Sequence, residues 1–171
     1  MQVTGFHMPG EFFGMDGIET NYYKDYVEAL DTSSVCKIPL ELLTRSTAQS
    51  GAEAENMMMA LVKLMSRTIS RDRNMLFSLG KMSARQRFSA FLLDISERMS
   101  QSGYSRNEFK LCMSRTDIAN YLCLALETVS RLFTQLQVEG VIKVDRRDVQ
   151  ILQMEALSHD EAEVRKFRKA G

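Results

Sequence analysis

The stretch from Glu53 to Leu79 contains neither glycine nor proline and is rich in Ala, Met, Leu, Lys and Arg, which favours a long helix. Within it, apolar residues recur at alternating steps of four and three, the spacing of a heptad seam. The positions of this seam are Met58, Val62, Met65, Ile69, Asp72, Leu76 and Leu79, and all but Asp72 are apolar. Because such a seam packs along another helix, this stretch limits the possible folds more than any other.

A second, largely apolar stripe lies beside the seam on the same predicted helix. Its members are Met57, Leu61, Leu64, Thr68 and Met75. Two apolar faces on one helix require two packing partners. The interpretation we favour packs one stripe against the chain's own domain and the other against a second copy of the helix. The alternative is a single helix buried on both sides within a monomer.

Asp72 is the one charged member of the seam. In a two-fold symmetric dimer its carboxylate faces its own mate, and two charges about 6 Å apart at an effective dielectric near 20 repel by about 3 kcal/mol. Dimerisation would then respond to small structural changes. The alternative is that the side chain of Asp72 rotates outward and costs little.

Residues 1–50 combine short apolar pieces with frequent glycine and proline, a pattern typical of β structure and turns. Residues 35–38 are predicted as a strand that Pro39 ends, because proline cannot donate to a strand ladder. A segment of this length is short for an independent β domain. We expect it to pack on the helix that follows or to belong to a larger β domain whose N-terminal part is missing.

Beyond the long helix, Ser83 and Gln86 form a capping box that predicts a second helix over residues 84–102. The loop after this helix is polar and carries Tyr104 at its tip. Residues 109–113 then alternate weakly between apolar and polar, as in a short strand.

A pair of short helices is predicted next. Ser114 and Asp117 give the capping signal for a helix over residues 115–122, residues 123–125 form a three-residue break, and a second helix covers 126–138. After this pair, two short predicted strands are joined by a turn that contains Arg146 and Arg147. This order of elements is the layout of a winged helix-turn-helix.

The second helix of this pair has the side chains that read a DNA major groove. Arg131 can place two hydrogen bonds on a guanine, Glu127 can accept from a cytosine amino group, and Ser130 can contact either kind of base edge. Thr128 can hold a phosphate with the backbone N–H groups of the helix start. The alternative is an exposed amphipathic helix pair that binds nothing. The predicted wing after the pair argues against this alternative.

Composition and motifs exclude several other classes of protein. The 22 Lys and Arg residues balance 22 Asp and Glu residues, which argues against a strongly basic coat for nucleic acid. No apolar run approaches the roughly 20 residues that span a bilayer, and the N-terminus lacks a signal-peptide pattern. Phosphate-loop and HExxH motifs are absent, and His7 and His159 are isolated. We therefore expect a cytoplasmic protein that is not an enzyme.

Four segments together carry a family resemblance. The run R-T-D-I-A-N-Y-L-C-L-A-L-E-T-V-S-R-L-F (Arg115–Phe133), followed by L-x-x-x-G-V-I, resembles the DNA-binding signature of the CRP/FNR transcription regulators. The segments G-F-H-M-P-G-E-F-F-G, V-E-A-L-D-T-S-S-V-C-K-I-P and E-F-K-L-C-M-S-R-T-D-I resemble the oxygen-responsive FNR branch. The resemblance extends over nearly the whole chain. It implies an α+β fold with a partial β-roll sensor (1–52), a long dimerisation helix (53–82) and a winged helix-turn-helix domain (83–171).

The resemblance also implies roles for particular residues. Glu127, Ser130 and Arg131 match base-reading positions, and the implied target is a palindrome of TTGAT-like half-sites bound by a homodimer. The dimer-seam positions of the family, its regulatory aspartate included, match Met65, Ile69, Asp72 and Leu76. The loop around Tyr104 matches a surface that touches RNA polymerase.

Cys36 matches one of the four cysteine ligands of an oxygen-labile 4Fe–4S cluster, and the family's other three ligands lie in a region that this chain lacks. A cluster needs about four thiolates, so we expect it in a full-length form and not in this chain alone. The resemblance therefore suggests an N-terminally truncated member. The Arg-Ser pair that grips a cyclic nucleotide is absent between Gly14 and Val35, so no cyclic nucleotide is expected.

Two positions in the helix pair depart from the family pattern. Cys123 stands where the turn usually has glycine, at a backbone position expected to need a positive φ. Ala125 replaces the usual Ser or Thr cap, a change worth about 1 kcal/mol.

The sequence thus predicts a dimeric, sequence-specific transcription regulator, with oxygen control implied by the resemblance. The alternative is a truncated, sensorless regulator, or an interaction partner that dimerises with a full-length relative and blocks it.

Overall fold

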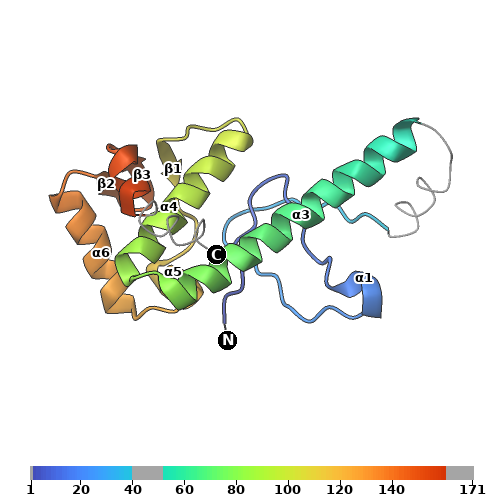
Figure 1. The fold of residues 1–171 in the computed structure, drawn as a ribbon, viewed down its shortest axis with the longest axis horizontal. Coiled ribbons are helices and arrows are strands. Elements are labelled where there is room, and N and C mark those ends of the chain that lie inside the picture. The colour runs from blue at the N-terminus through green and yellow to red at the C-terminus, as the bar shows by residue number, and fades with distance from the viewer. Residues whose placement is uncertain (1, 40–51, 161–171) are drawn as a thin grey trace. The chain divides into compact units, whose positions relative to one another are not determined.

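The computed structural model describes residues 2–39 and 52–160, which divide into two compact units (Figure 1). One unit contains residues 2–11 and 76–160, and the other contains residues 12–39 and 52–75. The elements are α1 (Gly17–Thr20), α3 (Ala52–Lys81), α4 (Ala84–Gln101), β1 (Glu108–Lys110), α5 (Arg115–Leu122), α6 (Leu126–Val138), β2 (Ile142–Asp145) and β3 (Asp148–Ile151). The predicted α+β fold is confirmed.

The long helix α3 confirms the glycine-free heptad stretch as a single helix of 30 residues, about 45 Å long. Gly80 lies inside this helix and does not stop it, contrary to the simple expectation for a glycine near a helix end. The chain leaves helical geometry at Met82, whose N–H still donates to the carbonyl oxygen of Ser78. The break falls there because Ser83 begins the next helix as its cap.

Helix α4 has the predicted capping box: the Ser83 side chain accepts from the backbone N–H of Gln86, and the Gln86 side chain accepts from the backbone N–H of Ser83. Its apolar face packs into the core of the surrounding unit. The buried members of that face are Phe88, Phe91, Leu92 and Ile95. Helix α4 contacts both α6 and β1, and α6 also contacts β2, so the helices and the small sheet of this unit share one core.

The sheet has three antiparallel strands in the order β1-β3-β2. Its central strand places Val149 opposite Phe109 of β1 and Val144 of β2. The hairpin of β2 and β3 is the predicted wing, and each strand lies one residue closer to the turn than the ranges 141–144 and 149–152 expected from sequence. Beyond the wing, residues 154–160 form a helical segment whose Leu157 is fully buried in the core.

The expected β structure of the first fifty residues is not found in the part that the structure describes. Residues 2–39 contain only α1 and irregular chain, so they do not form the implied partial β-roll. The strand predicted at residues 35–38 is absent, and Val35 and Ile38 are exposed. A strand needs a neighbouring ladder to satisfy its backbone, and residues 2–39 offer none. Residues 40–51 of this prediction lie outside the described residues, and residue 52 begins α3.

The N-terminal segment 2–11 groups with the winged unit and not with the predicted sensor. Phe6 is buried, with its ring centroid 5.0 Å from that of Tyr121 and 6.2 Å from that of Phe91. Arg98 of α4 forms ion pairs with Glu11 at 2.6 Å and Asp94 at 2.9 Å, and it also donates to the carbonyl oxygen of Phe6. These contacts explain why residues 2–11 group with the winged unit. The domain boundaries 1–52, 53–82 and 83–171 stay predictions.

Candidate nucleic-acid interface

The helix pair α5–α6 has the predicted limits, residue for residue. Ser114 caps α5: its side chain accepts from the backbone N–H of Asp117 at 3.1 Å, and the Asp117 carboxylate accepts from the backbone N–H of Ser114 at 2.8 Å. Cys123 ends α5 with a φ of 52°, the left-handed conformation expected at this turn. A left-handed cysteine costs roughly 1 kcal/mol relative to glycine, so the tight turn is held by the packing around it.

Helix α6 buries one face and exposes the other. The buried face consists of Val129, Leu132, Phe133 and Leu136. On the other side Glu127 and Arg131 are exposed, while Thr128 and Ser130 are half-buried. The four predicted base- and phosphate-contacting residues therefore lie together in the first two turns of one helix.

Arg131 lies one helical turn after Glu127, and its Nε donates to the Glu127 carbonyl oxygen at 3.4 Å. Glu127 also places a carboxylate in the first turn of α6, where the positive end of the helix dipole favours it. Ala125 occupies the N-cap position and gives no side-chain hydrogen bond there. The N-terminal end of α6 is consequently less well capped than the N-terminal end of α5.

Three arginines border a hollow beside this helix pair. Arg146 and Arg147 form the tip of the wing, and Arg115 begins α5. The guanidinium carbon of Arg115 lies 4.8 Å from the centroid of the Phe133 ring, a cation–π contact that fixes its direction. Guanidinium groups beside an exposed helix face suit the phosphates of a nucleic-acid backbone.

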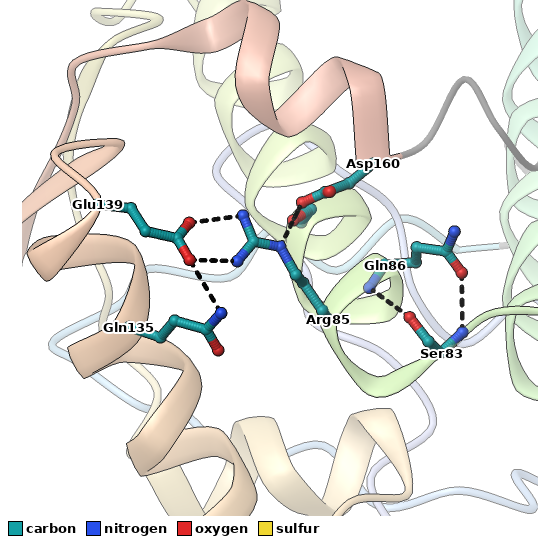
Figure 2. Close-up of polar contacts among 7 residues, drawn as sticks. Ser83, Arg85, Gln86, Gln135, Glu139 and Asp160 are labelled. Carbon is teal, nitrogen blue, oxygen red and sulfur yellow. Dashed lines mark hydrogen bonds and ion pairs between the residues drawn. The ribbon is translucent and has the colours of Figure 1, made fainter.

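The C-terminal end of α6 is joined to α4 by an ion pair between Glu139 and Arg85, which sequence patterns did not indicate. Arg85 donates from Nη1 and Nη2 to the two carboxylate oxygens of Glu139 at 2.8 and 2.7 Å (Figure 2). Its Nε donates to Asp160 Oδ2 at 3.0 Å. The pKa of Arg85 is raised, mainly by its hydrogen bonds to Glu139, although partial burial acts in the opposite direction. The pKa of Glu139 is lowered, most by the hydrogen bonds from Arg85 and next by the hydrogen bond from Gln135.

The predicted dimer seam on α3 is exposed to solvent in this chain. Met58, Val62, Met65, Ile69 and Leu76 have exposed fractions of 46%, 49%, 47%, 52% and 70%. Asp72 is also exposed, whereas Leu61, Leu64 and Met75 of the second stripe are half-buried. The division is not complete, because Leu79 of the seam is half-buried and Thr68 of the second stripe is exposed, and the side chain of Met57 lies outside the described residues. That a second copy of the helix covers the seam stays a prediction.

Tyr104 lies at the exposed loop after α4, with an exposed fraction of 58%. Cys36 is exposed in the irregular N-terminal segment. The sequence contains only three cysteines, and the other two, Cys112 and Cys123, belong to the winged unit. Since a 4Fe–4S cluster needs about four thiolates, the cysteines of this chain do not fit one.

Among residues 2–39 and 52–160, no three His, Cys, Asp or Glu side chains gather as a metal-binding group. The helices of the same described ranges are too short or too polar to cross a bilayer.

Comparison with known proteins agrees with this architecture. The Crp-like helix-turn-helix domain matches residues 86–159. The chain is 42% identical over 151 residues to the transcriptional activator protein FnrA of Stutzerimonas stutzeri, covering 88% of this chain and 60% of that protein. It is 42% identical over 157 residues to the transcriptional regulatory protein btr of Bordetella pertussis, covering 92% and 63%. The fumarate and nitrate reduction regulatory protein of Escherichia coli is 38% identical, with 92% and 61% covered.

The structure of FixK2 from Bradyrhizobium japonicum superposes with a TM-score of 0.61 at 25% identity, covering 70% of this chain and 57% of that one. The chain spans about three fifths of the length of the curated relatives named here. These relatives are regulators by name, in agreement with the expectation that the chain is not an enzyme.

Proposed function

This chain belongs to the CRP/FNR family of transcription regulators, and from that premise we propose that it regulates transcription by binding DNA sequence-specifically as a dimer. The observation that carries the proposal is the placement of Glu127, Ser130 and Arg131 on the first two turns of α6, away from its buried face. A helix of this kind enters the major groove with its N-terminal side chains toward the base edges.

The exposed seam of α3 supports the dimer. A row of half-exposed Met, Val and Ile side chains is the surface that a second copy of the helix covers in a coiled coil. A two-fold dimer presents its reading helices to half-sites about one helical turn, near 34 Å, apart. The family resemblance makes inverted TTGAT-like half-sites the target to try first.

Contacts to the DNA backbone come, in this proposal, from the arginines that border the reading helix. Arg115 is directed by the Phe133 ring, and Arg146 and Arg147 occupy the wing tip. Together with Thr128 at the helix start they supply charge and hydrogen bonds to phosphates. Tyr104, on its exposed loop, is the proposed contact to RNA polymerase.

The proposal is tested by titrating the chain onto a duplex with two inverted TTGAT half-sites and onto a scrambled duplex of equal length. We expect the wild-type chain to prefer the first, and Arg131→Ala to lose roughly 1–3 kcal/mol on it with a relaxed preference at one guanine. Equal losses on both duplexes would contradict base reading by Arg131. Wild-type binding that ignores sequence would contradict the function itself.

A sensorless mode of action is the second candidate, because the three cysteines of the chain do not suffice for a cluster. In this mode the chain dimerises, with itself or with a full-length relative, without responding to oxygen. Anaerobic iron–sulfur reconstitution separates the candidates: we expect no cluster absorption from this chain alone. The absorption spectrum of a stable cluster would contradict the sensorless mode and favour regulation by oxygen.

A further inference from the structure

The C-terminal end of the reading helix has a well-formed backbone cap and an unfavourable charge. Gly140 has a φ of 68°, Val141 N–H donates to Leu136 C=O, and Gly140 N–H donates to Gln137 C=O, which together make a Schellman motif. The cap residue itself is Glu139, and the last turn of α6 contains no basic residue. A carboxylate at the negative end of a helix dipole is destabilising unless a cation offsets it.

Arg85 supplies that cation from the first turn of α4. Its two-pronged contact with Glu139 fixes both distance and direction, because the planar guanidinium matches the carboxylate plane. Glu139 is further held by Gln135, one turn back on α6, whose Nε2 donates to Oε1 at 2.8 Å. Figure 2 shows Arg85 between Glu139 on one side and Asp160 on the other.

The guanidinium of Arg85 also donates a hydrogen bond to Asp160. Asp160, in the helical segment 154–160, accepts from Arg85 Nε and from the hydroxyl of the fully buried Ser89 at 2.8 Å. Side-chain exposure is 30% for Arg85 and 20% for Asp160, so water screens these contacts only in part. Three segments of the winged unit thus meet at one side chain.

We propose that Arg85 is a positioning residue for sequence reading: by fixing Glu139 to the start of α4, it sets the orientation at which α6 presents Arg131 and Glu127 to the bases. This inference rests on the proposed function. Arg131 lies eight residues before Glu139, about 12 Å along the helix, so a change of tilt at the Glu139 end displaces its guanidinium. Paired hydrogen bonds to a base edge tolerate only about 0.5 Å of displacement, whereas contacts to phosphates are more forgiving.

The measured quantity is the ratio of affinity for the inverted TTGAT duplex to affinity for the scrambled duplex. We expect Arg85→Ala to reduce this ratio about fivefold to tenfold, with a smaller loss of scrambled-duplex affinity. Arg85→Lys keeps the charge but not the two-pronged geometry, and it should restore the ratio only in part. A merely structural role would lower both affinities in proportion to the unfolded fraction, which thermal unfolding of each variant measures.

Arg106→Ala is the matched control, because Arg106 pairs with Glu97 at 3.3 Å with both side chains more than half exposed and neither on α6. It should leave the ratio unchanged. Glu139→Ala removes the unfavourable carboxylate together with its contact to Arg85, so it should lower the affinity ratio less than Arg85→Ala does. In the double variant, Glu139→Ala should add little to the loss from Arg85→Ala.

An unchanged ratio in Arg85→Ala and Arg85→Lys, with a wild-type chain that does prefer the TTGAT duplex, would overturn the inference and leave the proposed function intact. Full additivity of the Arg85 and Glu139 substitutions would also overturn it. A wild-type ratio of one would overturn the proposed function and the inference with it.

Discussion

Helices α3 and α4 follow one another and both have apolar stripes, yet they use them in opposite ways. The stripe of α4 is enclosed: Phe88, Leu92 and Ile95 have no exposed surface. The seam of α3 is open, with Ile69 half exposed. An amphipathic pattern therefore indicates that a face will be covered, while the structure decides whether the cover is the chain's own core or a separate surface. The difference makes α4 a folding element and α3 a candidate association element.

The strongest test of this contrast is a matched pair of truncations. Phe88→Ala should cost about 3–5 kcal/mol of unfolding free energy, because the ring is fully buried and meets Phe133 edge-on at 4.7 Å between centroids. Ile69→Ala should cost about 0.5 kcal/mol or less in the monomer. Urea unfolding at low protein concentration measures both, and similar costs would remove the distinction between the two helices.

The next largest effect concerns Asp72 in the open seam. Removing its charge in Asp72→Ala should relieve up to about 3 kcal/mol of repulsion between the two copies and tighten self-association by up to about a hundredfold. Sedimentation equilibrium of the two proteins measures the dimer constant, with Ile69→Ala as the control expected to weaken it. Identical constants for wild type and Asp72→Ala would mean that Asp72 does not face its mate.

A smaller effect, a gain in folding stability, is expected within the enclosed unit. Ala125→Ser gives α6 the side-chain cap that it lacks, and the gain should be about 1 kcal/mol of unfolding free energy. Because the extra hydrogen bond lies at the reading end, DNA affinity should not fall. Thermal unfolding reports the gain, and a lower melting temperature would show that the Ala125 backbone does not accommodate a cap.

The smallest effect is the pH dependence at the other end of α6. Hydrogen bonds from Arg85 and then Gln135 lower the pKa of Glu139, so its carboxylate stabilises the folded state above the ordinary glutamate range. That contribution is lost as pH falls through the lowered folded pKa. Glu139→Gln should therefore flatten the acid side of the stability curve, slightly, because the side chain is 36% exposed. A steeper acid limb in the variant would reverse the sign that we assign.

Interpretation from sequence succeeded where the structure depends on neighbours within a few residues. The capping boxes of Ser83 and Ser114, the limits of α5 and α6, and the left-handed Cys123 all depend on local spacing. It failed where a partner is distant or missing, as at residues 35–38, which have apolar residues but no ladder beside them. The roles of Thr128, Ser130 and Tyr104 stay predictions, although the structure leaves each at least partly exposed.

By itself, then, the sequence determined the helices α3 to α6, the turn between α5 and α6, the wing and the residues on the exposed face of α6, because periodicity and capping are properties of short stretches. Tertiary structure alone decided that Arg85 pairs with Glu139, 54 residues away, and that Arg98 pairs with Glu11, 87 residues away. It also decided which stripe of α3 stays open. Among 22 basic and 22 acidic side chains no pattern in the sequence selects one pair, since the choice depends on how distant segments pack.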